Sequence, residues 1–312
     1  MHQITTLQYA FGGILALLVV ASLVTATLIR AYPARNYVEL KLRIQTWWWL
    51  VGLCMLALGF GTTVAIVVVA LASFLAFKEF LTLVPTRPVD NGVLLLAYLA
   101  IPVQYWWVGI AWYGMFIIFI PVYVFLLLPL RMVINGETKG YLRAAGTLHW
   151  GLMTTVFSIS HLAYLLVLPD HAGPHGPVRA EMLVFYVVVL TQINDVAQYL
   201  WGKLLGRHKA VPKVSPNKTV EGLLGGVATT TALAWALAPW FTPLTAGFAL
   251  LAGLLIGTCG FIGDVVMSAV KRDIGVKDSS NFLPGHGGIL DRLDSLTYTA
   301  PVFFHYIYYL CY

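Results

Sequence analysis

Charged side chains and glycines concentrate in one stretch of this otherwise apolar chain, between Ser268 and Asp294. Such a run is not what a membrane-buried core requires, because burying an unpaired charge is costly. Its carboxylates, cations and flexible backbone suit a polyphosphate held by a divalent metal, since Mg²⁺ commonly bridges carboxylates and substrate phosphates. We therefore expect the chemistry of this protein to lie here.

Polar side chains at helical spacing lead into that stretch. Ser268 and Lys271 follow Asp264 by four and seven residues, so on a helix all three share one face. Farther on, Asp291 and Asp294 are three residues apart, and together with Asp264 they could hold Mg²⁺ through carboxylate oxygens. The alternative is a network of surface ion pairs.

A glycine-rich turn, Gly285-His286-Gly287-Gly288, separates these two groups. Glycine allows the backbone to approach a ligand closely. For His286 the sequence leaves a structural and a catalytic role equally open.

A second polar run, Ser215 to Gly222, immediately precedes an apolar span. Small hydroxyls, Lys218 and a helix start can cradle phosphate, because free backbone N–H groups and the positive helix end attract anions. Alternatively, a Ser or Thr caps the helix and Glu221 completes a capping pattern. Asp195 lies near the end of another span, where an ionisable residue usually faces a polar cavity or a partner such as Lys203.

The composition places the elements that must position these side chains in a membrane. Of 312 residues, 59% are hydrophobic and 10% are charged, and the mean hydropathy is +0.81. A soluble domain of this length needs a far more polar surface. We therefore predict an all-α fold, a polytopic integral membrane helical bundle of about ten transmembrane helices.

The predicted spans run from Leu7 to Ile29, Ile44 to Leu58, Thr62 to Phe80, Val93 to Val108, Trp112 to Leu130, Ala145 to Leu168, Met182 to Leu200, Leu223 to Trp240, Ala246 to Met267 and Leu296 to Tyr312. Gly59-Phe60-Gly61 and Gly109 are the expected turns where two long apolar stretches divide.

Positive charges set the expected orientation, because Lys and Arg in short loops stay on the cytoplasmic side. With these spans, every one of the 19 Lys and Arg residues except Arg179 falls on one face. Both termini would then lie outside, and both polar loops would face the cytoplasm. We expect a bacterial inner (plasma) membrane, with an organelle membrane as the alternative. The net charge of +6 then reflects topology and attraction to anionic headgroups and nucleotides, not nucleic-acid binding.

One membrane domain is the simplest organisation, with about six N-terminal helices in residues 1–180 and a catalytic region in residues 181–312. The three cysteines, Cys54, Cys259 and Cys311, lie within predicted spans without CxxC spacing. Neither a zinc site nor a disulfide framework is indicated.

The stretch from Ser268 to Asp294 resembles the signature of the CDP-diacylglycerol synthase (phosphatidate cytidylyltransferase) family. That pattern is Ser-x-x-Lys-Arg, a Lys-Asp pair, a Pro-x-His-Gly-Gly turn and an Asp-Arg-x-Asp close, and every part is present. The resemblance is specific from Asp195 onward, including the run from Ser215 to Gly222. It extends only faintly to Lys41-Leu-Arg43 and Lys78-Glu79-Phe80.

The resemblance implies transfer of CMP from CTP to phosphatidate or a related lipid phosphate, giving a CDP-lipid and pyrophosphate. It implies Mg²⁺ as the cofactor, with a second, monovalent cation left open. The expected partners are CTP, the lipid phosphate and membrane lipids, without nucleic acid, and a homodimer is left open. Because a phosphate oxygen is already a nucleophile, the reaction needs alignment and charge neutralisation and no covalent intermediate.

By position, the resemblance implies catalytic roles for Asp264, Asp291, Lys277 and His286. It implies metal ligation by Asp264 and Asp291, with Asp294 and Asp195 as further ligands or supporting groups. The implied substrate-binding residues are Ser215, Asn217, Lys218, Thr219, Ser268, Lys271, Arg272 and Arg292.

Three positions depart from the family pattern and leave the lipid acceptor open. Asn217 stands where many members have a second lysine, Val220 where an aromatic residue is frequent, and Gln198 where a small residue is usual. Within enzymology the alternatives are a paralogue that activates another lipid phosphate and a CTP-dependent polyprenol or lipid-alcohol kinase. From a different class, the alternative is a transporter or an inactive membrane partner of a lipid enzyme.

Overall fold

A computed structural model describes residues 2–33, 36–280, 282–283, 285 and 287–312, and they fold almost entirely into helices. The α-helices are α1 (His2–Ala31), α2 (Val38–Gly59), α3 (Thr62–Leu83), α4 (Asn91–Gly109), α5 (Tyr113–Ile118), α6 (Phe125–Ile134), α7 (Tyr141–Leu152), α8 (Ser158–Leu165), α9 (Ala180–Leu205), α10 (Val220–Phe241), α11 (Ala246–Ile274), α12 (Leu290–Leu293) and α13 (Leu296–Cys311). A short 3₁₀ helix, η1 (Pro88–Asp90), precedes α4, and two π-helical segments, η2 (Phe119–Val124) and η3 (Met153–Phe157), join α5 to α6 and α7 to α8.

The helices confirm the predicted polytopic all-α architecture. Eight of the described helical segments are long and apolar enough to cross a membrane. The other two predicted spans are also helical, as the continuous run Tyr141–Leu165 and as α13, which has 16 residues. The chain is therefore an integral membrane protein built as a helical bundle.

Both predicted turns are present. Gly61, with a φ of +100°, separates α2 from α3, and this left-handed conformation favours glycine because a Cβ would be strained there. α4 ends at Gly109, and the following turn is completed by Ala111 at a φ of +52°.

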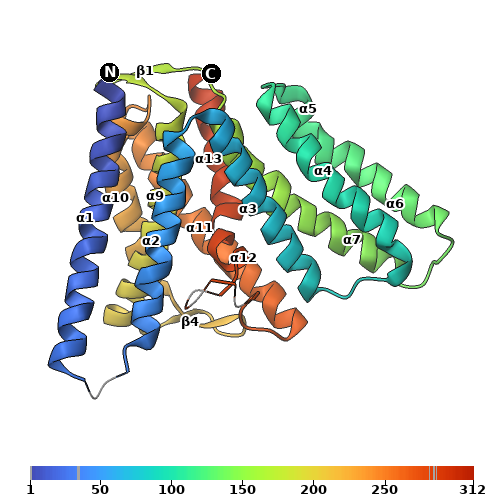
Figure 1. The fold of residues 1–312 in the computed structure, drawn as a ribbon, viewed down its shortest axis with the longest axis horizontal. Helices are drawn as coiled ribbons and strands as arrows, with labels where there is room; N and C mark the ends of the chain where they lie inside the picture. Colours follow the sequence, from blue (N-terminus) through green and yellow to red (C-terminus); the bar gives the residue numbers. More distant parts are fainter. Residues whose placement is uncertain (1, 34–35, 281, 284, 286) are drawn as a thin grey trace.

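The two termini lie together at one end of the molecule, beside β1 (His171–Gly173). β4 (Ser215–Thr219) and α12 lie toward the opposite end (Figure 1). The two polar loops meet there, since Arg272 Nε donates to the carbonyl of Val214 at 3.4 Å. In the view of Figure 1, α1, α2, α9 and α10 form the left-hand part, α4 to α7 form the right-hand part, and α13 lies between them.

Short strands complete both ends. β1 pairs antiparallel with β2 (Gly176–Val178), and β3 (Lys209–Val211) pairs antiparallel with β4. The second hairpin connects α9 to α10 and carries the polar run that begins at Ser215. Thr219 at its end caps α10, its hydroxyl accepting a hydrogen bond from the N–H of Gly222 at 3.1 Å.

A buried polar residue joins the three helices beneath the polar loops. Asn194 of α9 is fully buried, and its amide donates to the carbonyl of Gly257 on α11 at 3.1 Å. Its carbonyl oxygen accepts from the hydroxyl of Thr230 on α10, also at 3.1 Å. Polar contacts of this kind hold membrane helices together where apolar burial supplies little driving force.

We therefore expect Asn194→Ala to lower the free energy of unfolding by about 1 to 2 kcal/mol, because two interhelical hydrogen bonds are lost. Thermal unfolding of the purified protein in detergent measures this loss. Asn91→Ala is the control, since Asn91 is exposed at the start of α4. Equal unfolding temperatures for the two variants would show that Asn194 does not hold the helices together.

Candidate active site

α11 presents a carboxylate near its end to the β3–β4 hairpin. Asp264 Oδ2 lies 2.5 Å from Lys218 Nζ, and its Oδ1 accepts from the hydroxyl of Ser268 one turn farther along at 3.2 Å. Lys218 is held by more than this pair, since its Nζ also donates to Gln198 Oε1 at 3.3 Å and lies 4.9 Å from the ring centre of Phe261. The predicted polar face of α11 therefore contacts Lys218, in the polar run for which the sequence predicted phosphate binding.

A second ion pair follows on the same helix face. Lys271 Nζ donates to Asp291 Oδ1 at 2.8 Å, and both side chains are largely buried, at 12% and 5% exposed. The other oxygen of Asp291 accepts from the N–H and hydroxyl of Ser279, both at 2.8 Å, and from the N–H of Gly288 at 2.9 Å. Asp291 thus fixes both sides of the glycine-rich loop as well as facing Lys271.

Glu79, near the end of α3, ties the same loop to the N-terminal helices. Its Oε1 accepts from Ser280 Oγ at 2.8 Å and from the N–H of Ile289 at 3.1 Å. Its Oε2 accepts from Ser279 Oγ at 3.3 Å and from the N–H of Leu290 at 2.8 Å. A Cβ on Gly288 would collide with Glu79 Oε2 and Ser279 Oγ, so this approach requires a glycine.

Two further carboxylates lie where α9 meets the joint between α12 and α13. Both oxygens of Asp195 accept from Ser295 Oγ, each at 3.1 Å. Asp294 is buried, and its Oδ1 accepts from the N–H of Ser295 at 2.7 Å. Lys203 does not pair with Asp195 as one interpretation expected. It lies over the ring of Tyr199 instead, 5.9 Å from the ring centre.

The two aspartates of the α12 region differ in their electrostatic surroundings. Burial raises the pKa of Asp294 well above its usual range, and the nearby carboxylates of Asp264 and Asp195 raise it further. Burial also acts to raise the pKa of Asp291, but the hydrogen bonds from Lys271, Gly288 and Ser279 outweigh it, so the pKa falls. Three carboxyl groups therefore lie near one another around Asp294, whereas Asp291 is a carboxylate paired with Lys271.

Two buried donors at the site lack an acceptor among the residues that the structure describes. They are Nε of Arg292, which follows Asp291, and Nε2 of Gln198, whose other amide atom accepts from Lys218. A buried donor without a partner costs free energy that a hydrogen-bonding ligand can recover. Each of these two donors is thus free to bind an anionic ligand.

The carboxylates can bind a hard cation, but they do not supply all of its ligands. In the described part of the chain, no three His, Cys, Asp or Glu side chains converge on one point as metal ligands. The carboxylates of Asp264 and Asp195 nevertheless both lie near Asp294, and a divalent cation would offset the repulsion among the three. Mg²⁺ is commonly held by one or two carboxylates, with water and substrate phosphates completing its shell, and this donor set fits that pattern.

The remaining predicted site residues differ in their contacts and exposure. Arg272 donates to the carbonyls of Val214 at 3.4 Å and Val276 at 3.2 Å, so it braces the hairpin. Lys277 and Asn217 are exposed, and Ser215 is half-buried in β4. His286 lies outside the described residues.

Thr219 serves as the helix cap, which was the structural alternative for this run. Glu221 does not complete a capping pattern with it. Its carboxylate accepts instead from the N–H groups of Arg207 and His208 at 3.0 and 3.2 Å, and so closes the hairpin against α10.

The sequence interpretation assigned no role to four polar residues that shape the site, two of them within the charged stretch itself. Ser279, Ser280 and Ser295 hydrogen-bond its carboxylates, and Glu79 arrives from a helix some two hundred positions earlier in the chain. A signal for Glu79 was present, because a carboxylate within a predicted span usually has a polar partner.

The sequence of this chain is similar to those of cytidylyltransferases. The model of the cytidylyltransferase family matches residues 41–310. The uncharacterized protein YnbB of Escherichia coli (strain K12) is 46% identical over 306 residues, which cover 98% of this chain and 100% of YnbB.

Relatives with a named activity match a shorter region. The phosphatidate cytidylyltransferase of Staphylococcus aureus (strain COL) is 41% identical over 128 residues, and that of Bacillus subtilis (strain 168) is 45% identical over 123 residues. These alignments cover 40% and 38% of this chain, and 49% and 44% of the two relatives. The similarity to them thus spans less than half of either chain.

Proposed function

The chain belongs to the cytidylyltransferase family, and we propose that it is a phosphatidate cytidylyltransferase that converts CTP and phosphatidate to CDP-diacylglycerol and pyrophosphate. The observation that carries this proposal is the convergence of two lysine–aspartate pairs, Lys218–Asp264 and Lys271–Asp291, at one end of a membrane bundle. Cations and carboxylates side by side suit a substrate that arrives as a metal-bound polyphosphate.

In the proposed reaction, an oxygen of the lipid phosphate forms a bond to the α-phosphorus of CTP. The bond from that phosphorus to the oxygen bridging to the β-phosphate breaks, and pyrophosphate leaves with the electron pair. The attacking oxygen is already anionic, so no side chain has to remove a proton from it. The protein has to align the two phosphates and neutralise their charge.

Lys218 and Lys271 are the residues that supply positive charge in this scheme. Each ammonium group is now paired with an aspartate, and a triphosphate offers a competing anion of higher charge. Arg292 Nε and Gln198 Nε2 would donate to phosphate oxygens, since both are buried donors without an acceptor among the described residues. Ser268 holds Asp264 in place through its hydroxyl.

Mg²⁺ is the proposed cofactor, held by Asp264 with Asp195 or Asp294, and when bound it would neutralise the developing charge on the phosphoryl groups. Asp291 and Asp294 differ in this respect. Asp291 is engaged by Lys271, Ser279 and Gly288, so its contacts favour a role in ordering the loop. The nearness of Asp264 and Asp195 to Asp294 favours cation binding there.

The proposed location is the bacterial inner membrane, with the two polar loops facing the cytoplasm, where CTP is found, and both termini on the other side. The common end of the two loops (Figure 1) supports this orientation. A lipid phosphate lying at that membrane surface could reach the site while its acyl chains stay in the bilayer.

Incubation of the purified protein with labelled CTP, Mg²⁺ and phosphatidate tests the proposal, with both CDP-diacylglycerol and pyrophosphate scored. We expect both products in equal amounts, none after chelation of the metal, and recovery when Mg²⁺ is added back. A phospholipid product together with CDP would instead identify a lipid kinase. A protein that binds CTP but makes no product from phosphatidate would reject phosphatidate as the acceptor.

A second candidate is transfer of CMP to a different lipid phosphate. It is favoured by the extent of the matches, because the relative aligned over 98% of this chain is uncharacterized, whereas alignments to named phosphatidate cytidylyltransferases cover only about two fifths of it. The same assay with a panel of lipid phosphates distinguishes the two candidates. The acceptor that gives the highest kcat/KM identifies the substrate.

A further inference from the structure

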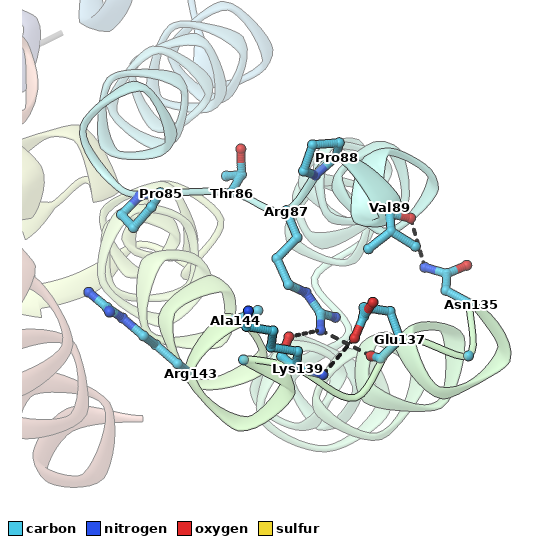
Figure 2. A pocket seen from close by; sticks show the side chains of 12 residues that line it. Pro85, Thr86, Arg87, Pro88, Val89, Asn135, Glu137, Lys139, Arg143 and Ala144 are labelled. Carbon is cyan, nitrogen blue, oxygen red and sulfur yellow. Dashed lines mark hydrogen bonds between the residues drawn. The ribbon is translucent and has the colours of Figure 1, made fainter.

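A basic pocket lies between the segment that follows α3 and the loop that joins α6 to α7. It is separate from the carboxylate cluster of the candidate active site, which is formed by Asp195, Asp264, Asp291 and Asp294. Its volume is about 780 Å³, and its lining includes Arg87, Lys139 and Arg143 against one acidic residue, Glu137. Figure 2 shows these side chains around the pocket, with Arg143 extending from α7 on the side of Pro85. The pocket thus has more positive than negative side chains.

The guanidinium of Arg87 is already hydrogen-bonded, and its contacts hold the two sides of the pocket together. Its guanidinium donates to both oxygens of Asp90, at 2.6 and 3.0 Å, and this aspartate is buried. It also donates across the pocket to the carbonyls of Glu137 at 3.1 Å and Lys139 at 2.9 Å, contacts that are drawn in Figure 2. One side chain therefore fixes the α6–α7 loop against the segment after α3.

The charges of Lys139 and Arg143 remain available. Both residues are exposed, and neither forms an ion pair with another residue in the described part of the chain. The Glu137 carboxylate accepts from the backbone N–H of Lys139 at 2.8 Å, which holds this acid within its own loop. Two unpaired cations in a preformed pocket favour an anionic ligand.

Exposed apolar side chains lie within a few residues, along the chain, of the residues that line the pocket. Leu142 is 81% exposed, Ile134 69%, Val133 60% and Val89 39%. Ile134 and Pro88 are the terminal residues of two candidate membrane spans, so the pocket lies where a span meets the headgroup layer. We call these four exposed apolar residues the apolar collar. Cations can bind the phosphate of a phospholipid, and exposed apolar side chains can contact its acyl chains.

We propose that this pocket binds the phosphate of an anionic lipid headgroup through Lys139 and Arg143, with the acyl chains lying along the apolar collar. The site does not depend on the proposed transfer of CMP, because its lining residues are not those of the carboxylate cluster. Its ligand is a constituent of the surrounding bilayer and need not be a substrate.

The test uses phosphatidylglycerol, an anionic phosphodiester that cannot accept CMP at its phosphate in the proposed reaction. Native mass spectrometry of the detergent-solubilised full chain measures how much lipid is retained, and hydrogen exchange of residues 135–144 shows where it binds. We expect phosphatidylglycerol to slow exchange in this segment. The double variant Lys139→Gln/Arg143→Gln should bind it at least ten times more weakly, with an unchanged unfolding temperature.

The control variant is Arg30→Gln, which removes an exposed cation at the end of α1, outside the pocket, and should leave the protection of residues 135–144 unchanged. Equal protection by zwitterionic phosphatidylcholine, or retention of protection in the double variant, would overturn the proposal. Equal protection by inorganic phosphate alone would assign the pocket to a free anion and reject the lipid. Because no arm measures CMP transfer, failure of the proposed activity would not affect the result.

Discussion

Replacing Asp264 by asparagine is expected to lower the rate of CMP transfer by about three orders of magnitude, equivalent to ~4 kcal/mol in the barrier. Asparagine keeps the size of the side chain but removes the charge that pairs with Lys218 at 2.5 Å. It would also weaken the binding of a divalent cation, because hard cations prefer charged oxygen ligands. The rate of CDP-lipid formation at saturating CTP and lipid measures the effect.

The matched control is Asp273→Asn, which removes an exposed carboxylate from the same helix nine residues farther on. It should retain nearly full activity, since no proposed ligand or substrate contact involves it. Raising the Mg²⁺ concentration should recover part of the activity of Asp264→Asn if the loss is one of metal affinity. An Asp264→Asn protein as active as Asp273→Asn would remove Asp264 from the proposed mechanism.

The helices of this protein could be predicted from sequence because their signal is local. Apolar length fixes each span, and glycine at Gly61 fixes a turn that needs a positive φ. The polar face of α11 was also predictable, since residues four and seven apart on a helix share a face whatever surrounds it. Asp264, Ser268 and Lys271 accordingly lie together, each with a partner in the site.

The partners themselves could not be predicted, because they depend on how distant helices pack. Spacing alone offered both Asp291 and Asp294 as metal ligands, yet Asp291 is bound by Lys271 and loop N–H groups and Asp294 lies near two other carboxylates. That difference depends on which residues of distant segments lie beside each carboxylate, which no local pattern sets. The contact of α3 with the glycine-rich loop has the same origin.

The second large effect is expected at Glu79, which accepts four hydrogen bonds from the loop between Ser279 and Leu290. Glu79→Ala removes every acceptor and leaves the N–H groups of Ile289 and Leu290 without partners. We expect kcat to fall about a hundredfold, because a shift of roughly 1 Å in a reacting group can cost that much. Steady-state kinetics of CMP transfer measure it, with hydrogen exchange of residues 279–290 as the structural readout.

Glu79 contacts the loop and none of the residues proposed to bind the substrates. We therefore expect it to act by positioning Asp291 through Ser279, and two variants test this role. Glu79→Gln offers one acceptor oxygen and places an NH₂ group against backbone donors, so it should lose activity and speed exchange to an intermediate degree. Glu39→Gln is the control, since Glu39 is an exposed glutamate on α2 whose carboxylate pairs with Arg43 of the same helix. Lost activity with unchanged exchange of residues 279–290 would contradict positioning and would place Glu79 in contact with the substrates instead.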